Sequence, residues 1–260
     1  MANDFSSDAN CVALYRFESG ALTVDSKGTN TLTAVQSPTE ELVDFKEGVG
    51  CVALDDSNPA DLFSITDANL NSGFPCKSGE TNKAFSVCCW FKCHDLTASY
   101  TDTICGKQGG GAASFWINVQ ALGDVHLAVF GAGWQEYVHA TKIAANIWYH
   151  LGVTYDDSDK SYRIRIWDDN AGAILGVDKT GTGTKNMVIT ADPFMIGSAM
   201  TWAAHSFDGL IDEVVVFNDI LTTDQIDAIR SGTYGSGGGG GANLLEGLIS
   251  ESPLLQGLLA

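Results

Sequence analysis

The chain has 260 residues and a formal net charge of −18, because 32 acidic residues outnumber 14 lysines and arginines. A domain of this length buries a core large enough to be stable without disulfides or structural metals. Phosphate contacts require clustered lysines and arginines, so the charge argues against a nucleic-acid partner. It favours a soluble domain whose negative field suits cations or basic surfaces.

The seven cysteines are odd in number and lack the two paired Cys-x-x-Cys motifs of a zinc site. Most lie in apolar runs such as 85–91, which predicts small buried side chains in a reducing compartment. The N-terminus is polar and acidic, and no apolar stretch reaches the about 18 residues of a membrane-spanning helix. We therefore expect no membrane span, and a protein that is made in the cytoplasm or released by lysis.

Short apolar runs separated by turn-forming residues follow one another along most of the chain. The segment 25–30 is predicted to turn, because Asp25 and Ser26 can bond their own backbone and Gly28 permits a positive φ. A short turn at Gly123 and Asp124 is predicted to join two strands. Strands are predicted at 11–17, 45–54, 62–65, 85–92, 103–107, 114–119, 124–130, 147–155, 162–167 and 194–197.

The segment 207–229 is predicted to form a central strand, a corner and one short helix. Val214 and Val216 alternate with apolar neighbours, so both faces of the strand should be buried. Either Thr222 or Thr223 is expected to cap the helix, whose Ile226 would face the core.

Several motifs in this order resemble the laminin-G-like (concanavalin A-like) jelly-roll family. The matching stretches are Gly-Leu-Ile-Asp-Glu-Val at 209–214, Leu-Thr-Thr-Asp-Gln-Ile at 221–226, Phe-Ser-Val-Cys-Cys-Trp-Phe-Lys at 85–92 and the strand at 147–155. The resemblance covers residues 10–232 and implies an all-β fold. That fold is a two-sheet antiparallel jelly-roll sandwich with one short C-terminal helix. Many short, evenly spaced strands indicate a sandwich independently.

The composition changes after residue 234, which divides the chain into a sandwich (1–234), a Gly-rich linker (235–241) and a leucine-rich tail (242–260). The tail holds two similar units whose spacing places four aliphatic side chains on one face of a short helix. Such a helix is marginal in water and needs a partner, so we expect docking on a larger protein assembly or self-association. The docking residues are Leu244, Leu245, Leu248, Ile249, Leu254, Leu255, Leu258 and Leu259.

The sequence does not show a catalytic motif. Some glycosidases of this superfamily carry Glu-x-Asp-x-x-Glu on one strand, and that pattern is absent. Asp212 and Glu213 are adjacent, so they are expected on opposite faces of their strand. Nucleophile-elbow and histidine metal-site spacings are also absent. We predict that the protein is not an enzyme, with a glycoside hydrolase as the less favoured alternative.

Calcium is the cofactor that the resemblance implies, because related domains can hold an ion between the early loop and the closing strand. Carried over by position, the ligands would be Asp25, Asn30 and Asp212. The alternative is that Asp25 and Asn30 only organise a turn and that Asp212 only hydrogen-bonds a neighbouring corner.

A glycan is the second ligand that the resemblance implies. Trp134 and Trp202 lie in predicted loops and are the candidates for stacking on a sugar. Loop tryptophans also cover sheet edges, so a packing role stays open. The other tryptophans fall in predicted strands and are expected in the core or on a sheet face.

These features predict a non-catalytic display or adhesion module that its tail anchors to a larger assembly. By analogy with phage proteins, we expect a virion surface and a capsid-decoration, head-fibre or tail-associated role, with a host glycan as the ligand. The alternative is an extracellular bacterial carbohydrate-binding or adhesion module.

Overall fold

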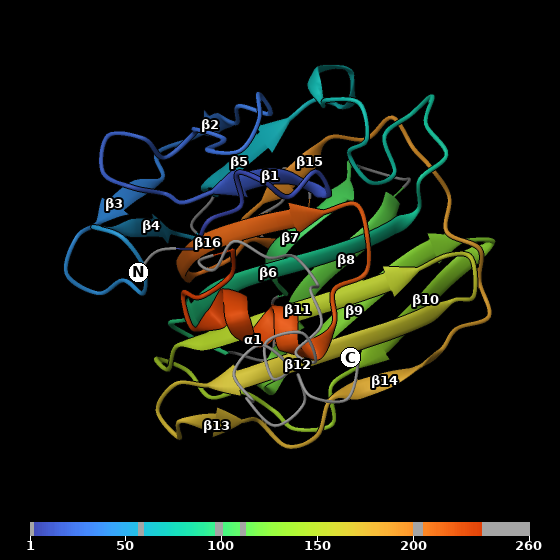
Figure 1. Ribbon diagram of the computed structural model, residues 1–260. Coiled ribbons are helices and arrows are strands. Elements are labelled where there is room, and N and C mark those ends of the chain that lie inside the picture. Colours follow the sequence, from blue (N-terminus) through green and yellow to red (C-terminus); the bar gives the residue numbers. More distant parts are fainter. Residues whose placement is uncertain (1–2, 57–59, 97–100, 110–112, 200–204, 236–260) are drawn as a thin grey trace, which may run out of the picture.

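The computed structural model describes residues 3–56, 60–96, 101–109, 113–199 and 205–235, and these residues form a two-layer antiparallel β-sandwich (Figure 1). The fold class predicted from the sequence is confirmed. Short 3₁₀ turns at Asp67–Asn69 and Ala121–Gly123 interrupt the strands, and one α-helix, α1, spans Thr223–Arg230.

The front layer in Figure 1 is a nine-stranded sheet in the described part of the chain, with the path β13-β12-β11-β6-β16-β4-β3. Two further strands join at its sides, since β1 pairs with β16 and β14 pairs with β12. The strands are β1 (Cys11–Tyr15), β3 (Thr39–Glu41), β4 (Cys51–Leu54), β6 (Ala84–Cys93), β11 (Tyr149–Asp156), β12 (Ser161–Asp168), β13 (Ala173–Ile174), β14 (Lys179–Thr182) and β16 (Gly209–Phe217).

The rear layer is a seven-stranded sheet over the same described residues, in the order β10-β9-β8-β7-β15-β5-β2. Its strands are β2 (Thr33–Val35), β5 (Leu62–Ile65), β7 (Asp102–Gln108), β8 (Ala113–Gln120), β9 (Asp124–Gly131), β10 (Gly133–Val138) and β15 (Phe194–Ile196).

Alternating side chains divide each central strand between the inner core and an outer face. On β16, Val214 and Val216 enter the core between the sheets, whereas Val215 and Phe217 pack outside against α1. Gly152 of β11 lies under the helix, where a Cβ would come within 2.5 Å of an Ile226 methyl carbon. The predicted two-faced burial of this strand is therefore confirmed.

A β-bulge interrupts this alternation at Asp212 and Glu213. The pairing register between β16 and β6 shifts between Asp212 and Val215, and Glu213 has a φ of 49°. Ile211 and Val214 both enter the core, although they are three residues apart. The expectation that the two carboxylates simply alternate across the strand is therefore wrong, because the bulge inserts an extra residue.

The N-terminal segment closes the fold over the end of α1. The Asp4 amide donates to the Tyr234 carbonyl at 2.8 Å, and the Phe5 and Tyr234 rings stack at 5.2 Å between centroids. Both rings belong to the cluster that covers the outer face of the nine-stranded sheet. The chain therefore leaves the described fold on that face.

All seven cysteines are buried and free, as the sequence predicted. Burial raises the pKa of Cys105 to about 12 and that of Cys89 well above its ordinary value. These thiols act as small apolar side chains rather than as nucleophiles.

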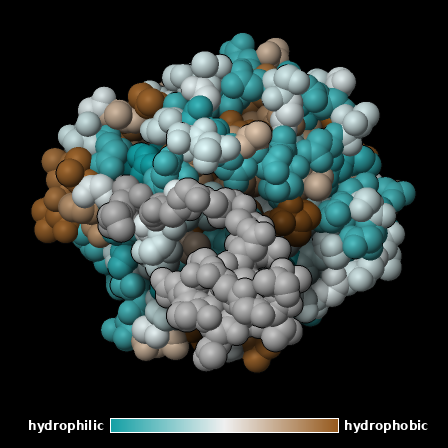
Figure 2. Space-filling model, in the orientation of Figure 1, coloured by the Kyte–Doolittle hydropathy of each residue, from teal (hydrophilic) through white to brown (hydrophobic). Residues whose placement is uncertain are grey.

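The face with α1 is mostly polar where Figure 2 shows it, with an apolar group at its left edge over the loop that joins β3 and β4. Leu42, Val43 and Val49 of that loop are exposed. Among the described residues, no helix is long and apolar enough to cross a membrane.

Candidate functional site

The outer face of the seven-stranded sheet carries three aromatic side chains near its β10 edge, which we call the aromatic platform: Trp116, Phe130 and Trp134. The Trp134 ring lies 4.4 Å from Phe130 and 6.0 Å from Trp116, measured between centroids. Trp116 is buried, whereas Trp134 is 54% exposed. A half-exposed indole braced by a second ring can stack against the apolar face of a flat or cyclic ligand.

Strand register brings the platform together. Trp134 pairs with Phe130 in the ladder, and Trp116 pairs with Ala128 on the same face. The prediction that Trp134 lies in a loop is wrong, because it is the second residue of β10. Gly133, at a φ of 101°, allows a turn tight enough for the chain to re-enter the sheet before the tryptophan.

Polar side chains lie beside the platform on the same three strands. Gln120 donates to a Glu136 carboxylate oxygen at 3.3 Å, and His126 Nδ1 lies 3.8 Å from the other carboxylate oxygen. Asn118 pairs with His126 in the ladder between β8 and β9. Burial lowers the pKa of His126, so its imidazole is neutral at physiological pH. Together they place hydrogen-bonding groups next to an aromatic surface.

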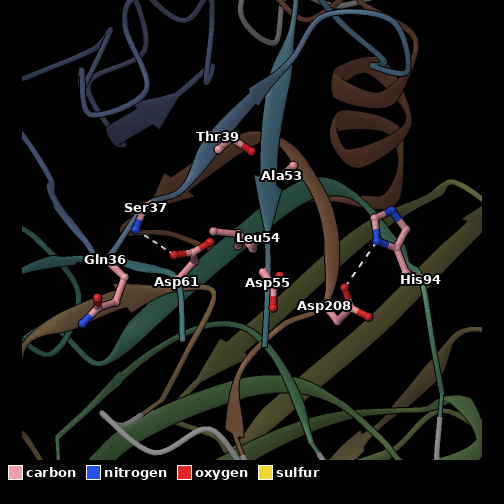
Figure 3. Close-up of a pocket in the computed structure, with 9 residues that line it drawn as sticks. All are labelled: Gln36, Ser37, Thr39, Ala53, Leu54, Asp55, Asp61, His94 and Asp208. Carbon is pink, nitrogen blue, oxygen red and sulfur yellow. Dashed lines mark hydrogen bonds and ion pairs between the residues drawn. The ribbon is translucent and has the colours of Figure 1, made fainter. Parts of the chain in front are cut away.

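A pocket of about 520 Å³ lies away from the platform, at one rim of the sandwich (Figure 3). Asp61 accepts the Ser37 amide at 2.8 Å, and His94 Nδ1 lies 3.3 Å from Asp208. The lining residues are Gln36, Ser37, Thr39, Ala53, Leu54, Asp55, Asp61, His94 and Asp208. Its three carboxylates make this rim unsuited to anionic ligands.

Further acidic groups lie behind this pocket. Asp102 is buried and accepts the Asp208 amide at 3.1 Å. Burial, with smaller contributions from the charges of Asp208, Asp56 and Asp95, raises the pKa of Asp102 to about 7. This rim therefore concentrates negative charge without a lysine or arginine among its lining residues.

The early loop forms the predicted turn. Asp25 Oδ1 accepts the amides of Leu14 and Lys27, and its Oδ2 accepts two N–H groups of Asn30. The Asn30 side-chain oxygen accepts the Asn71 amide at 2.7 Å. Each oxygen that was predicted to bind calcium here is thus occupied by N–H donors.

Asp212, the third predicted ligand, serves a different loop. Its Oδ2 accepts the Lys46 and Glu47 amides at 2.9 and 3.0 Å, and its Oδ1 has no hydrogen-bond partner. Burial raises the pKa of Asp212 to about 7. Among the described residues, no three His, Cys, Asp or Glu side chains are grouped closely enough to hold a metal ion. Calcium at Asp25, Asn30 and Asp212 stays a prediction, and these hydrogen bonds do not favour it.

Three predictions fall outside the described residues. They are Trp202, the Gly-rich linker beyond Gly235, and the docking tail with its eight aliphatic residues at 244–259. The tryptophans that were expected in the core or on a sheet face are confirmed there for Trp90, Trp116 and Trp148, all of them buried.

Sequence reasoning missed Phe130 as the neighbour of Trp134, and it missed Asn118 and His126 as polar groups on the same outer face. Alternation alone places Trp116 and Asn118 on one face of β8 and His126 and Phe130 on one face of β9. What the sequence lacked was the register that joins these faces to β10.

The family comparison agrees with this architecture. A family model described as the concanavalin A-like lectin/glucanases superfamily matches residues 67–227, more than half of the chain. The chain belongs to this superfamily. A search of curated protein sequences found no match.

Solved structures share the fold at low identity. Domain 4 of AbnA, a GH43 extracellular arabinanase from Geobacillus stearothermophilus in complex with arabinotriose, matches with a TM-score of 0.60 at 22% identity, over 85% of this chain and 98% of that one. The binding domain of botulinum neurotoxin DC in complex with SialylT matches with a TM-score of 0.62 at 11% identity, over 86% of this chain. The botulinum neurotoxin serotype C1 binding domain gives 0.61 at 13% identity, over 85% of this chain. This chain spans about half the length of the two botulinum domains, 52% of each.

Proposed function

We propose that this protein is a non-catalytic glycan-binding module in which the aromatic platform stacks on sugar rings. The observation that carries the proposal is the exposed Trp134, braced by Phe130 at 4.4 Å and flanked by hydrogen-bonding side chains. Sugars combine apolar ring faces with hydroxyl groups, so an aromatic surface next to polar groups suits them. Two of the structural neighbours were solved with a bound glycan, arabinotriose and SialylT, which supports the same ligand class.

A binding role fits the platform better than hydrolysis. Glycoside hydrolysis requires two carboxyl groups on either side of the scissile bond. Glu136 is bonded to Gln120, and Asp124 on the same sheet is paired with Lys142 at 2.6 Å. Neither arrangement resembles a free acid facing a free nucleophile.

The exit of the chain supports a display role. Phe5 and Tyr234 hold the last described residues on the outer face of the nine-stranded sheet, whereas the platform lies on the outer face of the other sheet. A module anchored through residues 242–260 would then direct its platform away from the anchor. We propose attachment to a larger assembly, with a virion surface as the setting and a bacterial extracellular surface as the alternative.

The binding proposal is tested by screening the full chain and a Trp134→Ala variant on an array of neutral and sialylated glycans. We expect at least one ligand for the wild type and at least about a tenfold loss of affinity for the variant, because stacking on an aromatic ring contributes much of the binding. Val43→Ala, which changes an exposed side chain on the β3–β4 loop, is the matched control and should bind normally. A wild-type protein that binds no glycan would overturn the proposal.

The anchoring proposal is tested separately by ending the chain after Tyr234. Size-exclusion chromatography should show that the truncated protein no longer assembles, while circular dichroism and glycan binding stay as in the full chain. Assembly that survives truncation would contradict a docking role for the tail.

A further inference from the structure

Asn118 is unusual among buried polar side chains because its amide makes no hydrogen bonds. It is 0% exposed, and neither its Nδ2 nor its Oδ1 has a hydrogen-bond partner. Among the described residues, it alone has two such atoms in one side chain. Buried amides are nearly always bonded, because each unpaired donor or acceptor loses its water without compensation. A residue kept in this state lowers the stability of the fold and calls for another role.

His126, which lies opposite Asn118 in the ladder, also has an unpaired polar atom. His126 is 6% exposed, and its Nδ1 also has no hydrogen-bond partner, since Glu136 lies 3.8 Å away. The two residues lie opposite each other on β8 and β9 and face outward from the core. Unpaired donors and acceptors therefore gather at one place on the sheet.

This place adjoins the aromatic platform. Asn118 is two residues after Trp116 on β8, and His126 is four residues before Phe130 on β9, so all four share the outer face. Along the strands the pair lies four residues, about 13 Å, from Trp134 and Phe130. A sugar ring stacked on Trp134 would therefore bring a later ring of the same oligosaccharide toward the pair.

The side chains of Asn118 and His126 determine which ligand groups can bind here. A carboxamide and a neutral imidazole each offer one kind of donor and one acceptor, as a hydroxyl group does. Glu136 adds an acceptor, and Lys142, a lysine near this end of the face, is already paired with Asp124. An anionic sugar would meet carboxylates here rather than a free cation.

Resting on the proposed glycan-binding function, we propose that Asn118 and His126 form a subsite that binds two neighbouring hydroxyl groups of a neutral oligosaccharide whose other end stacks on the platform. Because Asn118 is shielded without ligand, side chains over it must move as the sugar enters. The unpaired amide of Asn118 then forms its hydrogen bonds only in the complex. The stability that the free protein loses through this unpaired amide therefore contributes to the selectivity for a ligand that can pair with it.

The test uses calorimetric titration of the full chain with arabinotriose, cellotriose and maltotriose as neutral probes and with sialyllactose as the anionic probe. We expect the wild type to bind at least one neutral trisaccharide and to bind sialyllactose at least about tenfold more weakly. Asn118→Leu and His126→Phe should each weaken neutral binding at least about tenfold, because the hydroxyl groups lose their partners.

A second readout separates a binding role from a structural one. Asn118→Leu should raise the melting temperature by about 2–4 °C, since it removes two unpaired polar atoms from a buried position. The matched control is Asn30→Leu, because Asn30 is equally buried but fully bonded, and that variant should lower the melting temperature.

The outcomes that overturn the subsite differ from those that overturn glycan binding. If Trp134→Ala abolishes binding but Asn118→Leu and His126→Phe bind normally, the subsite is wrong and the platform stands. If the wild type prefers sialyllactose, the assigned sugar class is wrong. If Asn118→Leu lowers the melting temperature, the pair is structural. If no probe and no array glycan binds, the proposed function fails with the subsite.

Discussion

Two buried asparagines show how differently this fold treats its polar groups. Asn30 and Asn118 are both 0% exposed. The Asn30 amide donates to the Val12 carbonyl at 2.8 Å and to Asp25 at 3.1 Å, and its oxygen accepts the Asn71 amide at 2.7 Å. Asn118 makes none of the corresponding bonds. The same residue type thus holds a turn together in one region and stays unsatisfied in the other.

The difference separates structural from functional polar groups. A fully bonded buried amide stabilises the fold, because its removal would leave its partners unpaired. An unbonded one lowers stability, and such positions persist mainly where a ligand needs them. The early loop, Asp25 to Asn30, therefore belongs to the scaffold, whereas the face that carries Asn118 is the region to examine for binding.

The largest expected effect is on the scaffold side of this comparison. Asn30→Leu removes three hydrogen bonds and leaves the Val12 carbonyl and the Asn71 amide without these partners, whereas Asp25 keeps its backbone N–H donors. We expect a loss of about 3–5 kcal/mol in the free energy of unfolding, measured by urea denaturation. A loss below about 1 kcal/mol would show that the bonds around Asn30 are not needed, and would remove the contrast with Asn118.

Asp102 extends the comparison to a buried charge. Its pKa in the folded protein is about 7 against an ordinary value of 3.8, chiefly because of burial. The folded state therefore holds a proton that the unfolded chain releases, so the free energy of unfolding falls as the pH rises from about 4 to about 7. Asp102→Asn should remove the contribution of Asp102 to this fall and stabilise the protein at pH 8 by about 2 kcal/mol, with little change at pH 4. The contribution of Asp212, whose pKa is also about 7, should remain.

The measurement is urea denaturation of both proteins across this pH range. Asp124→Asn serves as the control, because Asp124 lies at a partly exposed position where it is paired with Lys142. If the wild type and Asp102→Asn keep parallel stability profiles from pH 4 to pH 8, Asp102 does not hold the proton.

Most of the fold could be predicted from the sequence, because each strand carries its own alternation and the closing motif at 207–229 is specific. Val214 to Phe217 are divided between two apolar clusters as their order predicted. The bulge at Asp212 and Glu213 could not be predicted, since nothing in the local pattern marks the extra residue.

The candidate site was less predictable than the fold. It depends on the pairing register of β8, β9 and β10, and on the absence of hydrogen-bond partners around Asn118. Trp134 was identified as a candidate by its residue type, but its place on β10 next to Phe130 follows from pairing across three strands. Asn118 could not be singled out, because an unpaired amide is defined by what surrounds it. In the same way, Asp25 could bind N–H donors or a cation with one and the same sequence pattern, and only the structure shows its four N–H donors.

The smallest expected effect decides between two neighbouring threonines at the start of α1. The Thr222 hydroxyl accepts the Gln225 amide at 3.2 Å, and the Gln225 side chain accepts the Thr222 amide at 2.9 Å, which forms a capping box. Thr223 is the first helical residue, and its hydroxyl does not take part in the box. Thr222→Ala should therefore lower the free energy of unfolding by about 1 kcal/mol, and Thr223→Ala should change it by less than about 0.5 kcal/mol. Because α1 covers the face opposite the platform, neither variant should alter glycan affinity, and equal losses from both would show that the box does not hold the helix.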